Sequence, residues 1–357
     1  MNIGIVGLPQ CGKKTLFKLL AGEDSFKKQF DPHRPLAGVA EVSDYRFDKL
    51  LSLYKPKKNV RSRLEITLLP KIEEQTVSQG NILKEMADVD ALCHVVRLFD
   101  DDAVYHLWGS VDAGRDIEYL NSELLLHDLL FVEKRLERIE HNLKKYKDDA
   151  ALKDRDILLE IKAFLESERP LRFMDLSHAQ PAQLANYPLL TRKKMIVVLN
   201  VSESDLHREE LWRPLADQCE RAGIDCIPVA AEMESEISLL DSAEERAQFM
   251  SEMGIAETAL TALTRMCIQS LGLISFFTVS NDEVRHWFVR NGSTVAEAAG
   301  TIHTDMQRGF IRAEVIRFDD LIQYGSEEKV KSAGKFYLKG REYIVEDGDT
   351  LGIRFSV

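Results

Sequence analysis

The chain has 357 residues, of which 45% are hydrophobic and 30% charged, and its net charge is −12. This composition predicts a folded protein of two or three domains, and the acidic balance argues against general nucleic-acid binding, because phosphate backbones are bound through Lys and Arg. No apolar run reaches the roughly 18 residues that a membrane span needs.

The first predicted elements are a strand at residues 2–7, "NIGIVG", and a helix at residues 14–22. Strand, glycine loop and helix in succession form the setting of a phosphate-binding loop. Four further short β-branched runs follow among helical stretches: "RLEITLL", "ALCHVVR", "KMIVVLN" and "DCIPVA". Strands that alternate with helices predict an α/β domain with a mostly parallel sheet covered on both faces.

Residues 116–170 interrupt this alternation with a predicted helical hairpin. Apolar residues recur at alternating spacings of four and three, which is the seam of a coiled coil. The polar stretch "KYKDDAALKD" turns the chain, and Pro170 ends the returning helix. Two alternatives stay open, an antiparallel coiled-coil hairpin inserted into the sheet domain and a plain helix pair packed flat against it. The seam residues are Leu125, Leu129, Val132, Leu136, Ile139 and Leu143.

A separate α+β module is predicted from residue 273 to the C-terminus. Alternating strands, glycine turns such as "RNGST", and one short helix in "TVAEAAGTIH" indicate it. Residues 274–357 carry 11 basic and 13 acidic side chains, so this region is nearly neutral and permits local RNA contact. The five cysteines form no C-x-x-C pair, and the opening "MNIGIVGL" lacks the charged segment of a signal peptide. Both features favour a reduced, cytoplasmic location.

The stretch "GLPQCGKKTL" nearly matches the phosphate-loop pattern G-x-x-x-x-G-K-[ST]. Gly7, Gly12 and Lys13 fit this pattern, but Lys14 stands where a hydroxyl should bind Mg²⁺. In such loops the backbone N–H groups surround the phosphates and the lysine reaches the terminal ones. The pattern therefore predicts phosphate binding and raises doubt about metal-dependent hydrolysis.

Over its full length the chain resembles the YchF branch of the Obg-like P-loop GTPases. The resemblance rests on "GLPQCGKKTLFKLL", "GVAEVSDYRFDKL" with "KPKK", "DALCHVVRLFDD", "RDIEYLNSELLLHDL", "VLNVSE", "AAGTIHTDMQRGFIRAEVI" and "AGKFYLKGREYIVEDGD". It implies a P-loop G domain at 1–115 and 190–272, an inserted helical hairpin at 116–189, and a β-grasp TGS domain at 273–357. It also implies association with ribosomes and a family tendency to prefer ATP to GTP.

The resemblance also assigns candidate site residues. Those implied for nucleotide phosphates are Gly7, Gln10, Cys11, Gly12, Lys13, Lys14 and Thr15. Those implied for the base are Asn200, Val201 and Glu203 in "LNVSE", with Ala230 and Ala231 in "VAAEMESEI". The longer Glu at position 203, in place of the usual Asp, argues against strict guanine specificity. In the TGS domain, His303 and Asp305 are implied in RNA contact; the alternative is that they only tie a turn together.

The chain departs from the family pattern where magnesium and the switches belong. In addition to Lys14, Leu68 falls at the first position of D-x-x-G and Lys71 at its glycine, while Pro32 falls at the switch threonine. The following glycine-rich loop is shortened to "IEEQTVSQGN" and keeps only Gly80. Magnesium prefers oxygen ligands, and Lys, Leu and Pro side chains offer none. We therefore expect no catalytic residues and no metal site.

The sequence leads to a nucleotide-binding, ribosome- or RNA-associated protein with a regulatory role in translation. It is expected to bind ATP or GTP with little or no dependence on Mg²⁺, and its hydrolysis is expected to be lost or very weak. The alternative is an active Obg/YchF-type ATPase or GTPase translation factor. For the loop itself, a further alternative stays open, in which Lys14 points to solvent and Gln10 and Cys11 only complete a tight turn.

Overall fold

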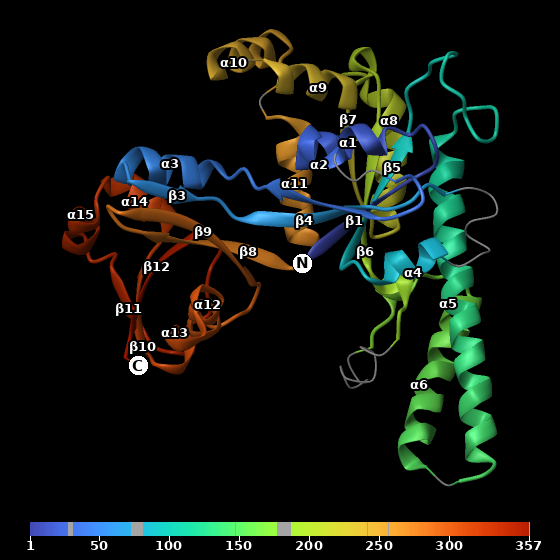
Figure 1. The fold of residues 1–357 in the computed structure, drawn as a ribbon. Helices are drawn as coiled ribbons and strands as arrows, with labels where there is room; N and C mark the ends of the chain where they lie inside the picture. Colours follow the sequence, from blue (N-terminus) through green and yellow to red (C-terminus); the bar gives the residue numbers. More distant parts are fainter. Residues whose placement is uncertain are drawn as a thin grey trace. The chain divides into compact units, whose positions relative to one another are not determined.

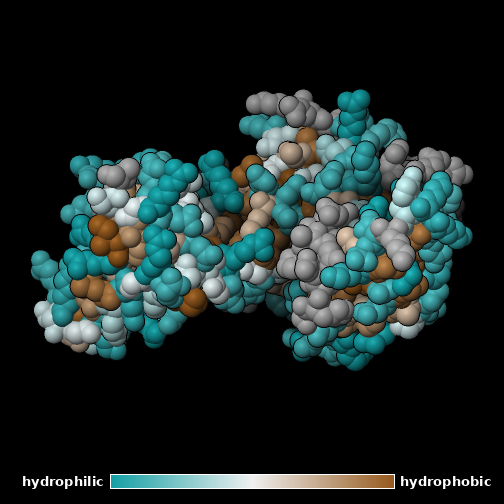
Figure 2. Space-filling model, turned by 90° about the horizontal axis from the view of Figure 1, so that it is seen from below, coloured by the Kyte–Doolittle hydropathy of each residue, from teal (hydrophilic) through white to brown (hydrophobic). Residues whose placement is uncertain are grey.

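The computed structural model describes residues 1–27, 31–72, 81–146, 148–176, 187–240, 242–255 and 257–356 (Figure 1). Their internal contacts define two compact units. The N-terminal unit comprises Met1–Val39 and Glu65–Leu260, and the C-terminal unit comprises Ala40–Leu64 and Thr261–Val357. Within the described ranges, no helix is both long enough and apolar enough to cross a membrane. On the face drawn in Figure 2, hydrophobic residues form small separate patches in a mostly hydrophilic surface.

The N-terminal unit is built around a six-stranded sheet with the strand order β2-β4-β1-β5-β6-β7. β1 is parallel to both β4 and β5, and the pairs β5–β6 and β6–β7 are also parallel. All seven residues of β5 are buried, as expected for a parallel strand covered on both faces. The predicted α/β fold is thus confirmed. The strands are β1 (Asn2–Val6), β2 (Leu36–Glu41), β4 (Arg63–Leu68), β5 (Ala91–Arg97), β6 (Lys194–Asn200) and β7 (Asp225–Val229).

Helices follow these strands along the chain. The long α5 (Ala113–Leu143) leaves β5, and α6 (Asp149–Glu166) returns toward β6. The short 3₁₀ turns are η1 (Leu171–Phe173), η2 (Leu190–Arg192) and η3 (Glu203–Asp205). The remaining helices are α1 (Lys13–Ala21), α2 (Glu23–Lys27), α4 (Asn81–Ala87), α8 (Glu209–Arg221), α9 (Ala231–Leu239), α10 (Ala243–Glu252) and α11 (Ala259–Ser270), the last of which spans the boundary between the units.

The helices α5 and α6 form the predicted antiparallel hairpin (Figure 1). The Asp112 carboxylate caps α5 by accepting from the Arg115 N–H, and Asp148 caps α6 in the same way. The alternative of a helix pair packed flat on the sheet domain is wrong for α6, whose buried residues pack with α5, and only the first half of α5 lies on the sheet. That half, with Leu120 and Leu124, belongs to the apolar core of the sheet, whereas all six seam residues pack in a separate cluster with α6.

The C-terminal unit contains a second six-stranded sheet, with the order β11-β10-β12-β8-β9-β3. The pairs β8–β9, β10–β11 and β10–β12 are antiparallel, and β8 is parallel to β12. The strands are β3 (Lys58–Val60), β8 (Leu273–Val279), β9 (Glu283–Arg290), β10 (Phe310–Ile316), β11 (Tyr337–Lys339) and β12 (Asp349–Phe355).

Helices are more numerous in the C-terminal unit than the sequence predicts. Beyond residue 290 we predicted one short helix, and the structure has four. The three that were missed span five to seven residues each, too short for a helical period to stand out. The helices of the unit are α3 (Tyr45–Tyr54), α12 (Val295–Ile302), α13 (Thr304–Arg308), α14 (Phe318–Tyr324) and α15 (Glu327–Ser332).

Residues 40–64 are built into the C-terminal unit although they lie far from it in sequence. β3 pairs in parallel with β9. The basic residues near β3 form ion pairs with acids near β9, and in one of them Lys57 Nζ lies 2.9 Å from Asp282 Oδ1. Phe47 and Leu50 of α3 are fully buried in a cluster with residues of β8 and α14. The three-part domain boundaries that the family resemblance implies remain a proposal.

Candidate functional site

The predicted phosphate loop connects β1 to α1. Gln10 has φ 61° and Gly12 has φ 94°, so the backbone turns through the left-handed region twice within three residues. Neither Gly7 nor Gly12 has room for a side chain. A Cβ on Gly7 would overlap the carbonyl oxygen of Val95, and one on Gly12 would overlap the Asn200 amide. The glycines of the pattern are therefore required by close backbone approach.

Lys13, the first residue of α1, folds back into this loop. Its side chain is 6% exposed, and Nζ donates to the carbonyl oxygen of Gly7 and, at 3.4 Å, to that of Leu8. Burial lowers the pKa of Lys13, and the nearby positive charges of Lys14 and Lys71 lower it further. An anion bound in the loop would offset both effects, so the site is electrostatically suited to phosphate.

Two titratable groups lie beneath the loop in neutral form. Cys11 is fully buried, and burial raises the pKa of its thiol. His94 on β5 is also buried, and burial together with the charge of Lys13 lowers its pKa to about 3. A buried protonated thiol and a neutral imidazole offer neither a nucleophile nor a general acid at neutral pH. The Cys11 side chain is therefore packed in the protein, and the phosphate contact predicted for this residue concerns its backbone N–H.

Asn200, at the end of β6, joins the phosphate loop to the start of α9. Its Nδ2 donates to the Cys11 carbonyl at 3.1 Å, and its Oδ1 accepts from the Ala231 N–H at 3.2 Å. The side chain is 6% exposed, and both of its polar atoms are thus engaged by backbone. The geometry gives Asn200 a positioning role between two loops that are far apart in sequence.

The other residues predicted for the base lie around Asn200. Val201 is buried, and its N–H donates to the Val229 carbonyl at 3.0 Å. Glu203 begins η3 with an exposed side chain. Ala230 and Ala231 are buried where α9 begins. The structure thus brings the predicted phosphate and base segments together, with Glu203 facing solvent.

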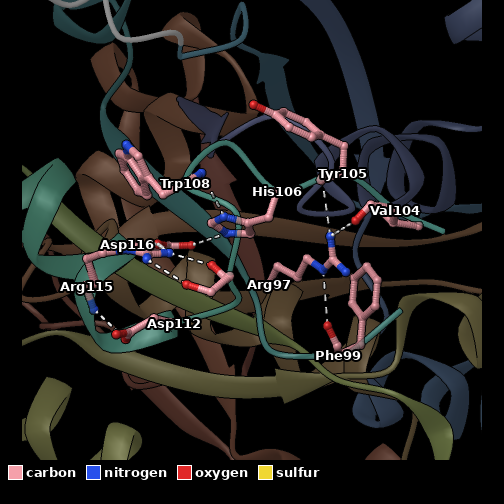
Figure 3. Close-up of polar contacts among 10 residues, drawn as sticks. Arg97, Phe99, Val104, Tyr105, His106, Trp108, Asp112, Arg115 and Asp116 are labelled. Carbon is pink, nitrogen blue, oxygen red and sulfur yellow. Dashed lines mark hydrogen bonds and ion pairs between the residues drawn. The ribbon is translucent and has the colours of Figure 1, made fainter. Parts of the chain in front are cut away.

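Arg97 is a positioning residue that sequence reasoning missed. It ends β5 with only 2% of its surface exposed, and its guanidinium donates to the carbonyl oxygens of Phe99 and Val104 at 3.1 and 2.9 Å (Figure 3). It also donates to the carbonyl oxygen of Asp101 at 3.0 Å. The N–H groups of Leu98 and Phe99 both donate to the Asn200 carbonyl, at 2.8 and 3.0 Å. Arg97 therefore fixes a loop that borders the base segment. The available signal was a cation at the end of the mostly apolar run "ALCHVVR".

The same loop is fixed at its far end by a buried pair (Figure 3). His106 Nε2 lies 3.1 Å from the Asp116 carboxylate, and Nδ1 accepts from the Trp108 N–H at 3.3 Å. Because Nδ1 is an acceptor, the imidazole proton is placed on Nε2 and donates to Asp116. Asp116 lies in the first turn of α5, so the loop links the end of β5 to the start of the hairpin.

The residues that depart from the family pattern line a small pocket beside Lys13. Its volume of about 20 Å³ leaves room for roughly one water molecule. Among the described residues that line it, four are cations and one is an acid, Asp31, whose carboxylate lies 3.7 Å from Arg34 Nε. The lining residues are Lys13, Lys14, Asp31, Pro32, Arg34, Leu68, Leu69, Pro70 and Lys71. Residues 73–80 of the shortened loop, including Gly80, lie outside the described residues.

These side chains do not fit a magnesium ion. Lys14, Pro32 and Leu68 supply no oxygen ligand, and Asp31 is already beside Arg34 while its Oδ1 accepts from the His33 N–H at 2.9 Å. The excess of positive charge suits a phosphate group instead. Lys14 lines the pocket, and Thr15 follows it in the first turn of α1.

In the C-terminal unit, His303 and Asp305 lie at the start of the short helix α13. His303 Nδ1 accepts from the Asp305 N–H at 3.2 Å and lies 3.5 Å from its carboxylate. The two side chains are 62% and 43% exposed. These contacts tie the turn, and the exposure leaves both side chains accessible to a partner.

The parallel sheet, the glycine loop between β1 and α1, and the asparagine that holds this loop from the end of β6 together indicate the P-loop class of α/β proteins.

A family profile, YchF-GTPase_C, described as a protein of unknown function (DUF933), matches residues 273–356. The chain is 40% identical to the "Ribosome-binding ATPase YchF" of Bacillus subtilis, with all of both chains covered. It is 36% identical to the "Obg-like ATPase 1" of Oryza sativa subsp. japonica, covering 100% of this chain and 92% of that protein. Its structure matches that of the Schizosaccharomyces pombe YchF GTPase with a TM-score of 0.83, at 30% identity over 99% of this chain and 97% of the other. The chain belongs to the YchF family.

Proposed function

We propose that this chain binds ATP or GTP at the phosphate loop without requiring Mg²⁺, and that its hydrolysis is lost or very weak. The observation that carries the proposal is the pocket beside Lys13, where Lys14, Pro32 and Leu68 lie together at the positions of the magnesium ligands and the switch. Phosphoryl transfer in P-loop proteins requires the metal and a positioned water. Here the cations would act on phosphate directly.

We also propose that the protein associates with the ribosome or with RNA and has a regulatory role in translation in the cytoplasm. Relatives that match over the full chain are named as ribosome-binding ATPases, which supports the association. The exposed His303 and Asp305 of the TGS domain and the α5–α6 hairpin are the proposed contact regions. Their contribution should weaken as salt rises, because phosphate contacts release counterions.

The deciding experiment is calorimetry with ATP, GTP, ADP and GDP, each with and without Mg²⁺. We expect weak binding that changes less than threefold on adding the metal, and no strict preference for guanine, because Glu203 replaces the usual Asp. Lys13→Ala should abolish binding, whereas Lys18→Ala, one turn further along α1, should leave it unchanged.

A large gain in affinity with Mg²⁺, accompanied by phosphate release, would favour the second candidate, an active ATPase or GTPase translation factor. The full-length similarity to named ATPases is the observation that favours this candidate. If Lys13→Ala binds as the wild type does, the loop is only a strand–helix connection and both candidates are wrong.

A further inference from the structure

A second cavity lies on the hairpin, away from the phosphate loop. Its volume is about 490 Å³, within the range of small-molecule sites. The described residues that line it are Phe131, Lys134, Arg135, Arg138 and Tyr187. Four of these fall at positions i, i+3, i+4 and i+7 of α5, so they share one face of the helix and the cavity runs along it.

The floor of this cavity is aromatic. The rings of Phe131 and Tyr187 are 6.2 Å apart at an interplanar angle of 58°, and Tyr187 is 8% exposed. Both rings pack against the apolar cluster of the hairpin, which includes Val132 and Leu136. The core therefore holds both rings in place, and Phe131 is the more exposed of the two.

The rim is basic although the chain as a whole is acidic. Lys134, Arg135 and Arg138 are all exposed, and they occupy neighbouring turns of α5. At the rings, burial and then the Asp154 carboxylate of α6 raise the pKa of Tyr187, while Arg135 lowers it. Among the described residues that line the cavity, the three charged ones are all cations.

We propose that this cavity binds single-stranded RNA, with a base stacked on Phe131 beside Tyr187 and the adjoining phosphates paired with Arg135, Arg138 and Lys134. Cations beside aromatic rings form the usual surface for unpaired nucleotides, because every base has a face that can stack. An acidic peptide would use the cations but would leave the rings without a role. The inference rests on the proposed association with the ribosome or RNA and assigns it a specific site.

The test uses the full-length protein and a fluorescent, unstructured 12-nucleotide RNA, followed by anisotropy at several salt concentrations. Arg135→Glu/Arg138→Glu should weaken binding at least tenfold and flatten the salt dependence by more than one unit of slope, because two phosphate contacts are lost. Phe131→Leu keeps the apolar volume but removes the ring. It should weaken binding about tenfold while leaving the salt slope unchanged, which separates stacking from charge.

The matched control is Arg208→Glu/Arg213→Glu, which makes the same charge change on exposed residues before and within α8. It should bind RNA within twofold of the wild type. The site is wrong if the wild type does not bind the RNA, if the control weakens binding as much as Arg135→Glu/Arg138→Glu, or if both cavity variants bind normally. Competition by polyglutamate as strong as by unlabelled RNA would assign the site to an acidic peptide instead.

Ribosome co-sedimentation of the same proteins separates this inference from the proposed function. Co-sedimentation of the wild type that both cavity variants retain would overturn the site and leave the association standing. RNA binding that depends on the cavity, without co-sedimentation of the wild type, would support the site and contradict the ribosome association.

Discussion

Asn200 holds its place because a carboxamide both donates and accepts. Its Nδ2 donates to the Cys11 carbonyl, and its Oδ1 accepts from the Ala231 N–H, so one side chain bridges the phosphate loop and the start of α9. Gly12 allows this approach, since any side chain there would overlap the Asn200 amide. The shape of the loop therefore depends on a residue that lies 189 positions away from Cys11 in sequence.

The change Asn200→Asp tests this bridge with almost no change in volume. The carboxylate can still accept from Ala231 but cannot donate to Cys11, and it sets a negative charge against a buried carbonyl oxygen. We expect a loss of about 2–3 kcal/mol in the free energy of unfolding and at least tenfold weaker nucleotide binding. Urea unfolding and calorimetry measure the two effects. Asn291→Asp, on an exposed turn, is the control and should change stability by less than about 0.5 kcal/mol.

Among the elements, α5 packs in two apolar clusters and has a buried acid between them. Asp128 is 0% exposed and lies between the half of α5 that packs on the sheet and the half that packs on α6. Its carboxylate accepts from the N–H groups of Leu190 and Thr191, both at 2.8 Å, and from the Thr191 hydroxyl at 2.6 Å. These contacts tie the hairpin to η2, which leads into β6 and thus to Asn200.

Replacing Asp128 by Ala should therefore loosen the hairpin and the strand that follows it. Three donors would be left buried without their acceptor, and we expect a loss of about 3 kcal/mol or more in the free energy of unfolding. Hydrogen exchange should show faster amides in α5 and η2. Asp156→Ala on the exposed side of α6 is the control, with an expected loss below about 0.5 kcal/mol. Equal losses for the two variants would mean that the carboxylate contacts do not anchor the hairpin.

Elements with a strong local pattern were predictable from the sequence, whereas contacts between distant segments were not. The glycine loop and the seam from Leu125 to Leu143 depend on spacing within one stretch of chain. The pairing of β3 with β9 joins residues more than 200 positions apart, and a three-residue strand has no period of its own. Lys13 and Arg97 were missed for a different reason. Their partners are backbone carbonyl groups two to seven residues away, and every residue has a carbonyl, so these contacts leave no pattern in the sequence.

Across the whole molecule, the segment between the two switch positions belongs to the other unit. The chain leaves the N-terminal unit after Val39 and re-enters it at Glu65, while Pro32 and Leu68 line the phosphate pocket on either side of this excursion. Within the C-terminal unit, Arg46 lies 2.8 Å from both Asp44 and Asp347. Burial by itself would raise the pKa of Asp44, but hydrogen bonds from Arg46 lower it below its usual value. The fold therefore stabilises the charged form of this carboxylate.

Arg46→Ala should destabilise the C-terminal unit by about 2–3 kcal/mol, because the half-buried Asp44 loses its partner. Arg63→Ala is the matched control. Arg63 pairs with Glu41 at 3.3 Å, but both side chains are more than 60% exposed, and such pairs contribute about 0–1 kcal/mol. Thermal unfolding followed by tryptophan fluorescence measures both. Similar losses in the two variants would show that Arg46 does not anchor residues 40–64.

The capacity for hydrolysis is also a property of several distant segments acting together. In the phosphate pocket, Lys14 comes from α1, Pro32 from the stretch before β2, and Leu68 from the end of β4. Transition-state contacts of this kind act as a unit, so repair of one recovers little of the rate.

We expect no phosphate release above background from the wild type or from Lys14→Ser, because the latter restores one hydroxyl while the carboxylate and the switch threonine stay absent. Without metal, Lys14→Ser should bind nucleotide more weakly than the wild type, since it removes a positive charge from the pocket. The assay compares both proteins with Lys14→Ser/Leu68→Asp, with and without Mg²⁺. Robust Mg²⁺-dependent turnover by the wild type would mean that the metal finds its ligands elsewhere in the chain, and the lost-hydrolysis proposal would then be wrong.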